Sequence, residues 1–158
     1  MKLLLRQRIF SWFDSYDIYD ENDEPVFTVQ GKLSWGHRLE ITDAAGNELG
    51  RVQEEILTFL PRFSLYLAGQ EAPMGQVRKE FSFFKPVYTL DCCGWQIQGD
   101  WLGWDYEVTD GSGRLVMQLS KELLHFSDTY VLDIQREEDA LLCLMIVLSI
   151  DAANCSDN

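Results

Sequence analysis

The sequence has few basic residues relative to its acidic ones. Its 158 residues include 13 Lys and Arg against 26 Asp and Glu, for a formal net charge of -13. Binding to nucleic acid draws most of its affinity from clustered Lys and Arg, so this balance argues against a nucleic-acid partner. It also disfavours a general attraction to anionic bilayers.

A hydrophobic run long enough to span a membrane is also missing. The longest apolar stretch, residues 140–150, is bounded by acidic residues, and a membrane-spanning helix needs about 20 apolar residues. At the amino end, the leucines at 3–5 are followed by Arg6 and Arg8, whereas a secretory signal needs roughly 7 to 15 apolar residues. The sequence therefore predicts neither a transmembrane segment nor an export signal.

Catalytic and metal-binding motifs are absent from the sequence. Cys92 and Cys93 are adjacent, and no Cys or His spacing matches a zinc site. Reduced thiols in a cytoplasm are the simplest account of the cysteines, and we expect no metal and no other cofactor. The two histidines, His37 and His125, occupy equivalent connectors of a repeat, which favours a structural role. With no nucleophile or nucleotide-binding motif present, we expect a protein that is not an enzyme.

The acidic stretch at residues 14–24 leaves one alternative open. Counted from Asp20, an EF-hand loop would need Gly at its sixth position and Glu at its twelfth. Those positions hold Pro25 and Gly31. We interpret the stretch as a solvated turn, with weak calcium binding as the alternative.

A unit of about 23 residues recurs along the chain. Each copy begins with alternating apolar and polar residues, passes through a turn rich in Asp, Asn and Gly, and continues in a second segment with two apolar residues three apart. Period-two alternation predicts half-buried strands, and the turns are typical of hairpins. Aromatic connectors separate the copies. The sequence predicts about twelve antiparallel strands over residues 3–135.

The last segment decides the architecture. Acidic residues at 137–139 favour a helix start, and the residues from 140 to 148 are apolar on every side of a helix. A helix without a polar face must be surrounded, and a propeller of three blades would leave it exposed. We therefore predict a mainly β fold. It is a single closed antiparallel barrel of about twelve strands around a central helix at about 137–153, in one domain over residues 1–158.

Several segments together resemble a known family. They are SYDIYDENDEPVFTVQGKLSWGH, ILTFLPRF, EFSFFKP and DTYVLDI, followed by the apolar helix. The whole chain resembles the LURP-one-related family, within the tubby carboxyl-terminal-like superfamily that includes the phospholipid scramblases. The resemblance implies a twelve-stranded barrel around a carboxyl-terminal helix. It also implies a role in binding phospholipid or phosphoinositide headgroups.

Two sets of residues are candidate contacts. Lys2, Arg6 and Arg8 form a small basic group that could contact lipid headgroups. Trp101 and Trp104 mark the place where we expect an exposed aromatic patch. We interpret most of the other tryptophans, Trp35 among them, as packing residues.

A barrel filled by a helix has no room for a ligand inside it. We therefore expect recognition on the outer wall or at the end loops. The sequence favours a non-catalytic cytoplasmic binding or scaffold module of unknown ligand, whose partner is an unknown protein or a lipid headgroup. The alternative is peripheral binding of phospholipid or phosphoinositide headgroups at a membrane surface. The sequence leaves the oligomeric state open.

Overall fold

Twelve β-strands and a carboxyl-terminal helix make up the computed structural model, which describes residues 1–6, 15–84, 87–100, 104–124 and 127–156. The strands are β1 (Lys2–Leu5), β2 (Ser15–Tyr19), β3 (Pro25–Ser34), β4 (Gly36–Asp43), β5 (Glu48–Glu54), β6 (Arg62–Leu67), β7 (Gly75–Glu80), β8 (Val87–Asp91), β9 (Gln96–Asp100), β10 (Asp105–Thr109), β11 (Leu115–Leu124) and β12 (Ser127–Ile134). A 3₁₀ turn at Glu137–Asp139 leads into helix α1 (Ala140–Ser156). The predicted mainly β fold with a terminal helix is confirmed.

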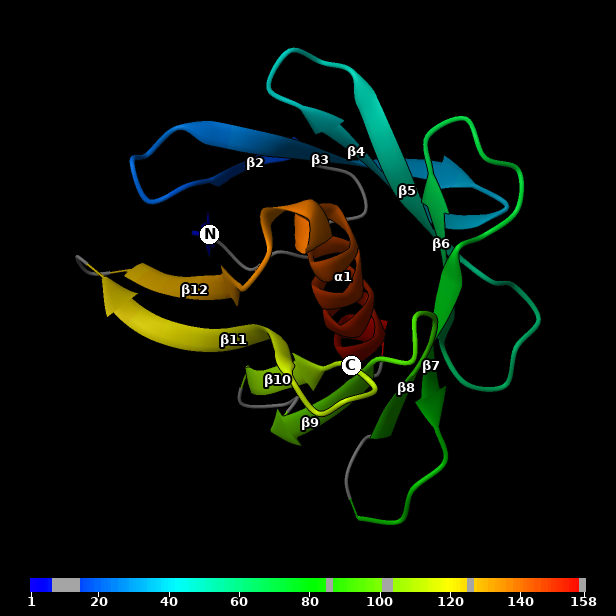
Figure 1. Cartoon of the computed structure of the whole chain (residues 1–158). Helices are drawn as coiled ribbons and strands as arrows, with labels where there is room; N and C mark the ends of the chain where they lie inside the picture. Colours follow the sequence, from blue (N-terminus) through cyan, green and yellow to red (C-terminus); the bar gives the residue numbers. More distant parts are fainter. Residues whose placement is uncertain (7–14, 85–86, 101–103, 125–126, 157–158) are drawn as a thin grey trace.

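The strands form one antiparallel sheet that curls around α1 (Figure 1). Its order is β8-β7-β6-β5-β4-β3-β2-β1-β12-β11-β10-β9, so the amino-terminal and last strands pair with each other, with Leu3 opposite Leu132. β8 and β9 are the two edges of the sheet, and no ladder joins them within the described part of the chain. The predicted barrel is therefore nearly closed, with a seam between β8 and β9.

The alternation of the strands sorts their side chains between the core and the solvent. In β4, Leu39 and Ile41 are fully buried, whereas Glu40 between them is half-buried on the outer face. In β6, Phe63 and Leu65 are buried as well, while Ser64 between them is covered by Glu55 and Gln76, to which its hydroxyl is hydrogen-bonded. Complete burial of each large apolar side chain contributes about 1.5–3 kcal/mol of hydrophobic free energy. The wall is thus held together by its contacts with the interior.

Helix α1 fills the interior. From Cys143 to Val147, five consecutive residues have no exposed surface. Because an α-helix turns once in about 3.6 residues, these side chains point in every direction around the axis. The helix is therefore enclosed on all sides, and the centre of the barrel is packed.

The carboxyl-terminal turns of α1 carry polar groups into this apolar interior. The Ser149 hydroxyl donates to the Met145 carbonyl oxygen at 2.7 Å, and the Tyr88 hydroxyl donates to Oδ1 of Asn154 at 2.5 Å. Asp151 is also buried. Because buried polar groups must keep their partners, these residues define the rotational position of an otherwise uniformly apolar helix.

Antiparallel neighbours place successive turns at alternate ends of the barrel. The turns after β2, β4, β6, β8 and β10 form what we call the hairpin end. The segments after β3, β5 and β7 belong to the connector end. In Figure 1 the β4–β5 turn extends to the top of the view and the β7–β8 connector to the bottom.

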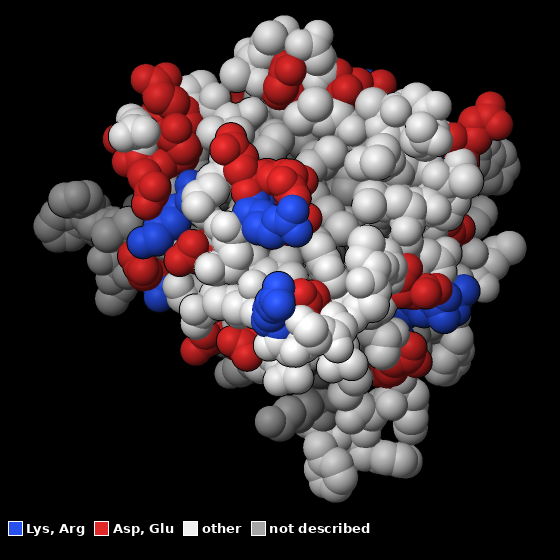
Figure 2. Space-filling view, viewed as in Figure 1, with Lys and Arg blue, Asp and Glu red and all other residues white. Residues whose placement is uncertain are grey.

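Three turns of the hairpin end share one design. Oδ1 of Asp20, Asp43 and Asp110 each accepts backbone N–H groups two and four residues further along, at 2.8–3.0 Å. Such Asp-centred turns satisfy the backbone without apolar residues. Figure 2 shows acidic side chains along the upper and left edges of the molecule, as expected for turns built on aspartate.

Candidate functional site at the connector end

The connector end exposes large apolar side chains on three neighbouring segments. We call this group the apolar rim. It comprises Trp35 after β3, Leu57 and Phe59 after β5, and Phe81, Phe83 and Phe84 after β7. The exposed fraction reaches 87% for Trp35, 100% for Leu57 and 97% for Phe84. The interpretation of Trp35 as a packing residue is therefore wrong. Soluble domains rarely gather exposed apolar side chains in this way without a binding role.

Polar contacts hold Trp35 in its exposed position. Gly36, which follows it, has φ +87°, and a Cβ there would lie 2.7 Å from the Glu54 carbonyl oxygen. Nε2 of Gln53 donates to the carbonyl oxygens of Trp35 and His37 at 3.2 and 3.3 Å. Nδ1 of His37 lies 2.6 Å from Oε2 of Glu54. The turn is thus fixed by its own contacts, and His37 takes part in fixing it.

The β5–β6 connector holds Leu57 in a strained conformation. Its φ is +62°, in the left-handed region, which costs a residue with a Cβ about 1–2 kcal/mol. The connector is tied down nearby, where the Lys79 N–H donates to the Pro61 carbonyl oxygen at 2.9 Å. Such strain persists when the surrounding structure imposes it, and it clusters at functional sites. Here it leaves Leu57 entirely in solvent.

A hollow beside the rim carries positive charge. Its volume is about 440 Å³, and we call it the basic hollow. Arg62, Arg78 and Lys79 line it, and Leu57 and Phe59 of the apolar rim form part of its border. Glu80 is the one carboxylate among its lining residues, and Oε1 of Glu80 accepts a hydrogen bond from the Thr89 hydroxyl at 2.8 Å.

Two of these cations face each other directly. Arg62 of β6 lies opposite Arg78 of β7 in the ladder. Side chains in such a pair have Cβ atoms about 4.5–5.5 Å apart, and like charges there repel. Arg78 is compensated by Asp91, whose Oδ2 lies 2.9 Å from Nη2. Within the described ranges, Arg62 makes no side-chain ion pair or hydrogen bond. The pair therefore leaves one guanidinium available to an anion.

Lys79 completes the positive side of the basic hollow. Burial lowers its pKa below the ordinary lysine value, because a charged ammonium loses hydration there. A bound anion would favour the charged form of this ammonium group.

The sequence model of one family matches residues 1–151, and that family is described as LURP-one-related. The chain belongs to the LURP-one-related family. The predicted resemblance is confirmed. The uncharacterised protein YxjI of Bacillus subtilis (strain 168) is 32% identical over 158 residues, which cover 99% of this chain and 96% of YxjI.

A solved structure with a similar fold comes from a plant. An Arabidopsis thaliana protein determined by X-ray crystallography is similar to this chain with a TM-score of 0.65. The match covers 96% of this chain and 90% of the plant protein, at 17% identity. This likeness supports the barrel and carries no information on ligands.

The basic group predicted at the amino end lies elsewhere on this LURP-one-related barrel. β2 to β5 separate β1 from β6 in the sheet. Lys2 is exposed on β1, opposite Asp133. The Arg6 guanidinium pairs with Asp23 and stacks over the Tyr19 ring, 4.6 Å from its centroid. Arg8 lies outside the described residues. Arg6 is thus already neutralised, and as a headgroup contact it would first have to leave Asp23.

The predicted tryptophan patch is described at one of its two residues. Trp104 is half-buried with φ +58°, and its ring centroid lies 4.7 Å from that of Tyr130. Trp101 lies outside the described residues, as does His125. A patch at this pair stays a prediction, while the exposed aromatic residues of the described chain gather on the rim.

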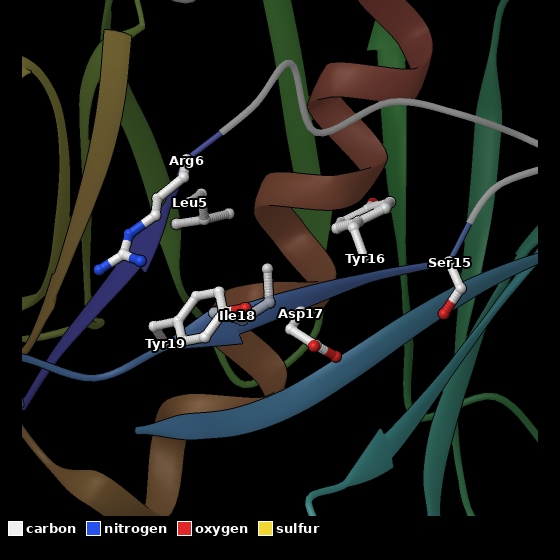
Figure 3. Close-up of a pocket in the computed structure, with 7 residues that line it drawn as sticks. All are labelled: Leu5, Arg6, Ser15, Tyr16, Asp17, Ile18 and Tyr19. Atoms are coloured by element: carbon white, nitrogen blue, oxygen red, sulfur yellow. The ribbon is translucent and has the colours of Figure 1, made fainter. Parts of the chain in front are cut away.

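A second hollow, of about 340 Å³, lies between β1 and β2 (Figure 3). Tyr16 points from β2 toward α1, and its hydroxyl has no hydrogen-bond partner among the described residues. Burial, followed by the nearby Asp151 carboxylate, raises the pKa of Tyr16. Residues 7–14, which join β1 to β2, lie outside the described part, so we assign no site to this hollow.

The acidic stretch forms strand β2 and the Asp20-centred turn in its described part, residues 15–24. Across the described chain, no group of three or more His, Cys, Asp or Glu is placed to hold a metal ion. Calcium binding stays an alternative for this turn. No helix of the described segments has the length and apolar character required to cross a bilayer.

Proposed function

We propose that this protein is a non-catalytic cytoplasmic module that binds phosphate groups of phospholipid headgroups at its basic hollow. The observation that carries the proposal is the Arg62–Arg78 pair, in which one guanidinium lacks a counter-ion in the described chain. Arginine presents a planar fork of donors that matches phosphate oxygens. The membrane-binding character implied by the family resemblance supports the same partner.

The charge distribution determines how such a module would approach a membrane. The net charge is -13, and a uniform distribution of it would repel an anionic surface. Glu21, Asp23 and Glu24 surround the β2–β3 turn at the hairpin end. Because surface charges beyond about 8–10 Å are largely screened at physiological salt, the local charge of the basic hollow governs contact. The connector end therefore faces the bilayer.

Co-sedimentation with vesicles tests this function. Vesicles of phosphatidylcholine alone and with phosphatidic acid or a phosphoinositide are compared at low and physiological salt. We expect binding to require the anionic lipid and Arg62→Gln to weaken it about tenfold, as expected for loss of a charge-assisted hydrogen bond.

The matched control is Arg114→Gln, which makes the same charge change at the hairpin end. It should bind like the wild type. Equal binding of wild type and Arg62→Gln would refute the basic hollow as the headgroup site. A hydrolase or transferase activity that persists through repurification would refute the non-catalytic assignment. Absence of binding to every vesicle would favour a protein partner instead.

A further inference from the structure

Headgroup binding at the basic hollow does not account for the exposed side chains of the apolar rim. We infer that Trp35, Leu57, Phe59 and Phe84 insert between lipid headgroups and reach the acyl-chain boundary of a phospholipid bilayer. The inference deepens the proposed function, because it rests on the basic hollow facing the same surface. It adds a second kind of contact, which depends on apolar area instead of charge.

The first argument is the shape of the rim. Its most exposed side chains project from three separate segments, after β3, β5 and β7. Leu57, Phe59 and Phe84 have exposed fractions of 96% or more, so little of their surface contacts the rest of the molecule. A bilayer surrounds each projecting side chain without needing a matching surface. A protein partner would have to present a separate pocket for each.

The second argument is that the projecting conformations are imposed by the structure. Gly36 and Gln53 fix the turn that carries Trp35, and Leu57 keeps a left-handed backbone although no packing is gained. Phe81 and Phe83 meet edge to face with ring centroids 5.0 Å apart, which gives the β7–β8 connector internal order. Ordered apolar tips lose little conformational entropy when they insert.

The third argument is continuity with the basic hollow. Leu57 and Phe59 border the hollow that holds Arg62. A further hollow beside the rim, of about 250 Å³, brings Lys79 together with Phe83 and Phe84. Apolar side chains next to Lys and Arg are the arrangement that interfacial binding favours, with aromatic rings at the acyl boundary and cations at the phosphate level. Both contacts can form at the same time.

Surface-pressure measurements on lipid monolayers test the insertion. A monolayer of phosphatidylcholine, which has no net charge, is used at physiological salt so that attraction of the basic hollow to anionic lipid contributes little. Wild-type protein injected below it should raise the surface pressure. The double variant Phe59→Ser/Phe84→Ser should lose at least nine tenths of this rise, because it removes two large apolar anchors.

The matched control is Leu67→Ser/Leu115→Ser, which removes two partly exposed leucines on strands that border the hairpin end. It should insert like the wild type. A rim variant that inserts as well as the wild type would overturn the inference. So would a wild-type protein that gives no pressure rise.

A second measurement excludes a second copy of the chain as the occupant. Sedimentation of the wild type and of Phe59→Ser/Phe84→Ser should give the same mass, because the rim of the free protein is open to solvent. A dimer that dissociates in the rim variant would overturn the inference. Failure of insertion is separable from failure of headgroup binding, since the first appears on neutral monolayers and the second on anionic vesicles with Arg62→Gln.

Discussion

The two ends of the barrel terminate the same repeating strands in opposite ways. At the hairpin end, an Asp side chain closes three of the turns through hydrogen bonds to backbone N–H groups. At the connector end, glycine at Gly36 and strain at Leu57 hold apolar side chains in solvent. Left-handed residues other than glycine occur at both ends, Asp23 and Cys93 at the hairpin end and Leu57 at the connector end. The ends therefore differ in what they expose: polar, hydrogen-bonded turns at the hairpin end and large apolar side chains at the connector end.

The sharpest test of this contrast uses two phenylalanines four positions apart. Phe63 is 1% exposed in the core and Phe59 is 96% exposed on the apolar rim. Phe63→Ala should lower the free energy of unfolding by about 3–5 kcal/mol, because it leaves a cavity. Phe59→Ala should change it by less than about 0.5 kcal/mol. Urea unfolding measures both. A large loss at Phe59 would show that the rim packs against the fold.

Two glycines at opposite ends separate conformational strain from steric crowding. Gly36 and Gly46 have similar φ values, +87° and +88°. A Cβ on Gly36 would meet Glu54 and Ile56 atoms within 2.9 Å, whereas one on Gly46 meets nothing within 4 Å. Gly46→Ala should therefore cost about 1 kcal/mol of unfolding free energy, from strain alone. Gly36→Ala should cost more, about 2–3 kcal/mol. Thermal unfolding of both variants measures the difference. Equal losses of melting temperature would contradict steric crowding around Gly36 in the Trp35 turn.

Relief of strain at Leu57 should trade function for stability. Asn tolerates the left-handed region better than Leu does, so Leu57→Asn should raise the free energy of unfolding by up to about 1 kcal/mol. The same variant should insert less into neutral monolayers, because it removes a fully exposed apolar tip. Chemical unfolding and surface pressure are read on one preparation. A destabilised variant would show that the Leu57 side chain supports the connector.

The smallest expected effect concerns pH at the hairpin end. Hydrogen bonds from the Asn47 side chain, then from backbone N–H groups, hold the pKa of Asp43 below its ordinary value. A carboxyl group with a lowered folded-state pKa stabilises the fold above its unfolded pKa, and this contribution is lost as the pH falls through the folded value. Asp43→Asn should therefore be slightly less stable than wild type at neutral pH.

The difference should shrink below about pH 4, where the unfolded carboxyl group becomes protonated. Urea midpoints at pH 7 and about pH 3 measure it. A difference that grows in acid would contradict the assigned hydrogen bonds. The comparison variant is Gly113→Asn, in the equivalent β10–β11 turn. It removes no titratable group, so its stability difference from the wild type should be the same at both pH values.

The strands and helix could be predicted because their signals are local. Period-two alternation at residues 39–43 or 63–67 specifies which side chains face inward, and the apolar residues after 139 have no polar face to expose. These patterns can be read from the sequence whatever the order of the strands in the sheet. The seam between β8 and β9 was not predicted. These two strands form the divergent repeat, and their apolar and polar residues alternate as in the other repeats, so the sequence does not show that the two strands fail to pair.

The candidate site escaped prediction because its signals are not local. Arg62 and Arg78 are sixteen positions apart, and their opposition follows from the length of the β6–β7 hairpin. The aromatic connectors are visible in the sequence, yet the same local pattern is compatible with an aromatic residue that packs inward and with one that projects outward. Gly36 after Trp35 was the available signal, since glycine permits a left-handed turn that directs its neighbour away from the core.

The position of α1 in the chain sets the order of events during synthesis. All twelve strands emerge from the ribosome before the helix that they enclose, and the ladder between β1 and β12 cannot form until β12 has been made. The inner faces of the strands therefore stay uncovered until Ala140–Ser156 has left the exit tunnel. Chaperones that bind nascent apolar segments have their longest opportunity at this stage. The packed centre of the barrel can therefore form only after the last described element of the chain has been made.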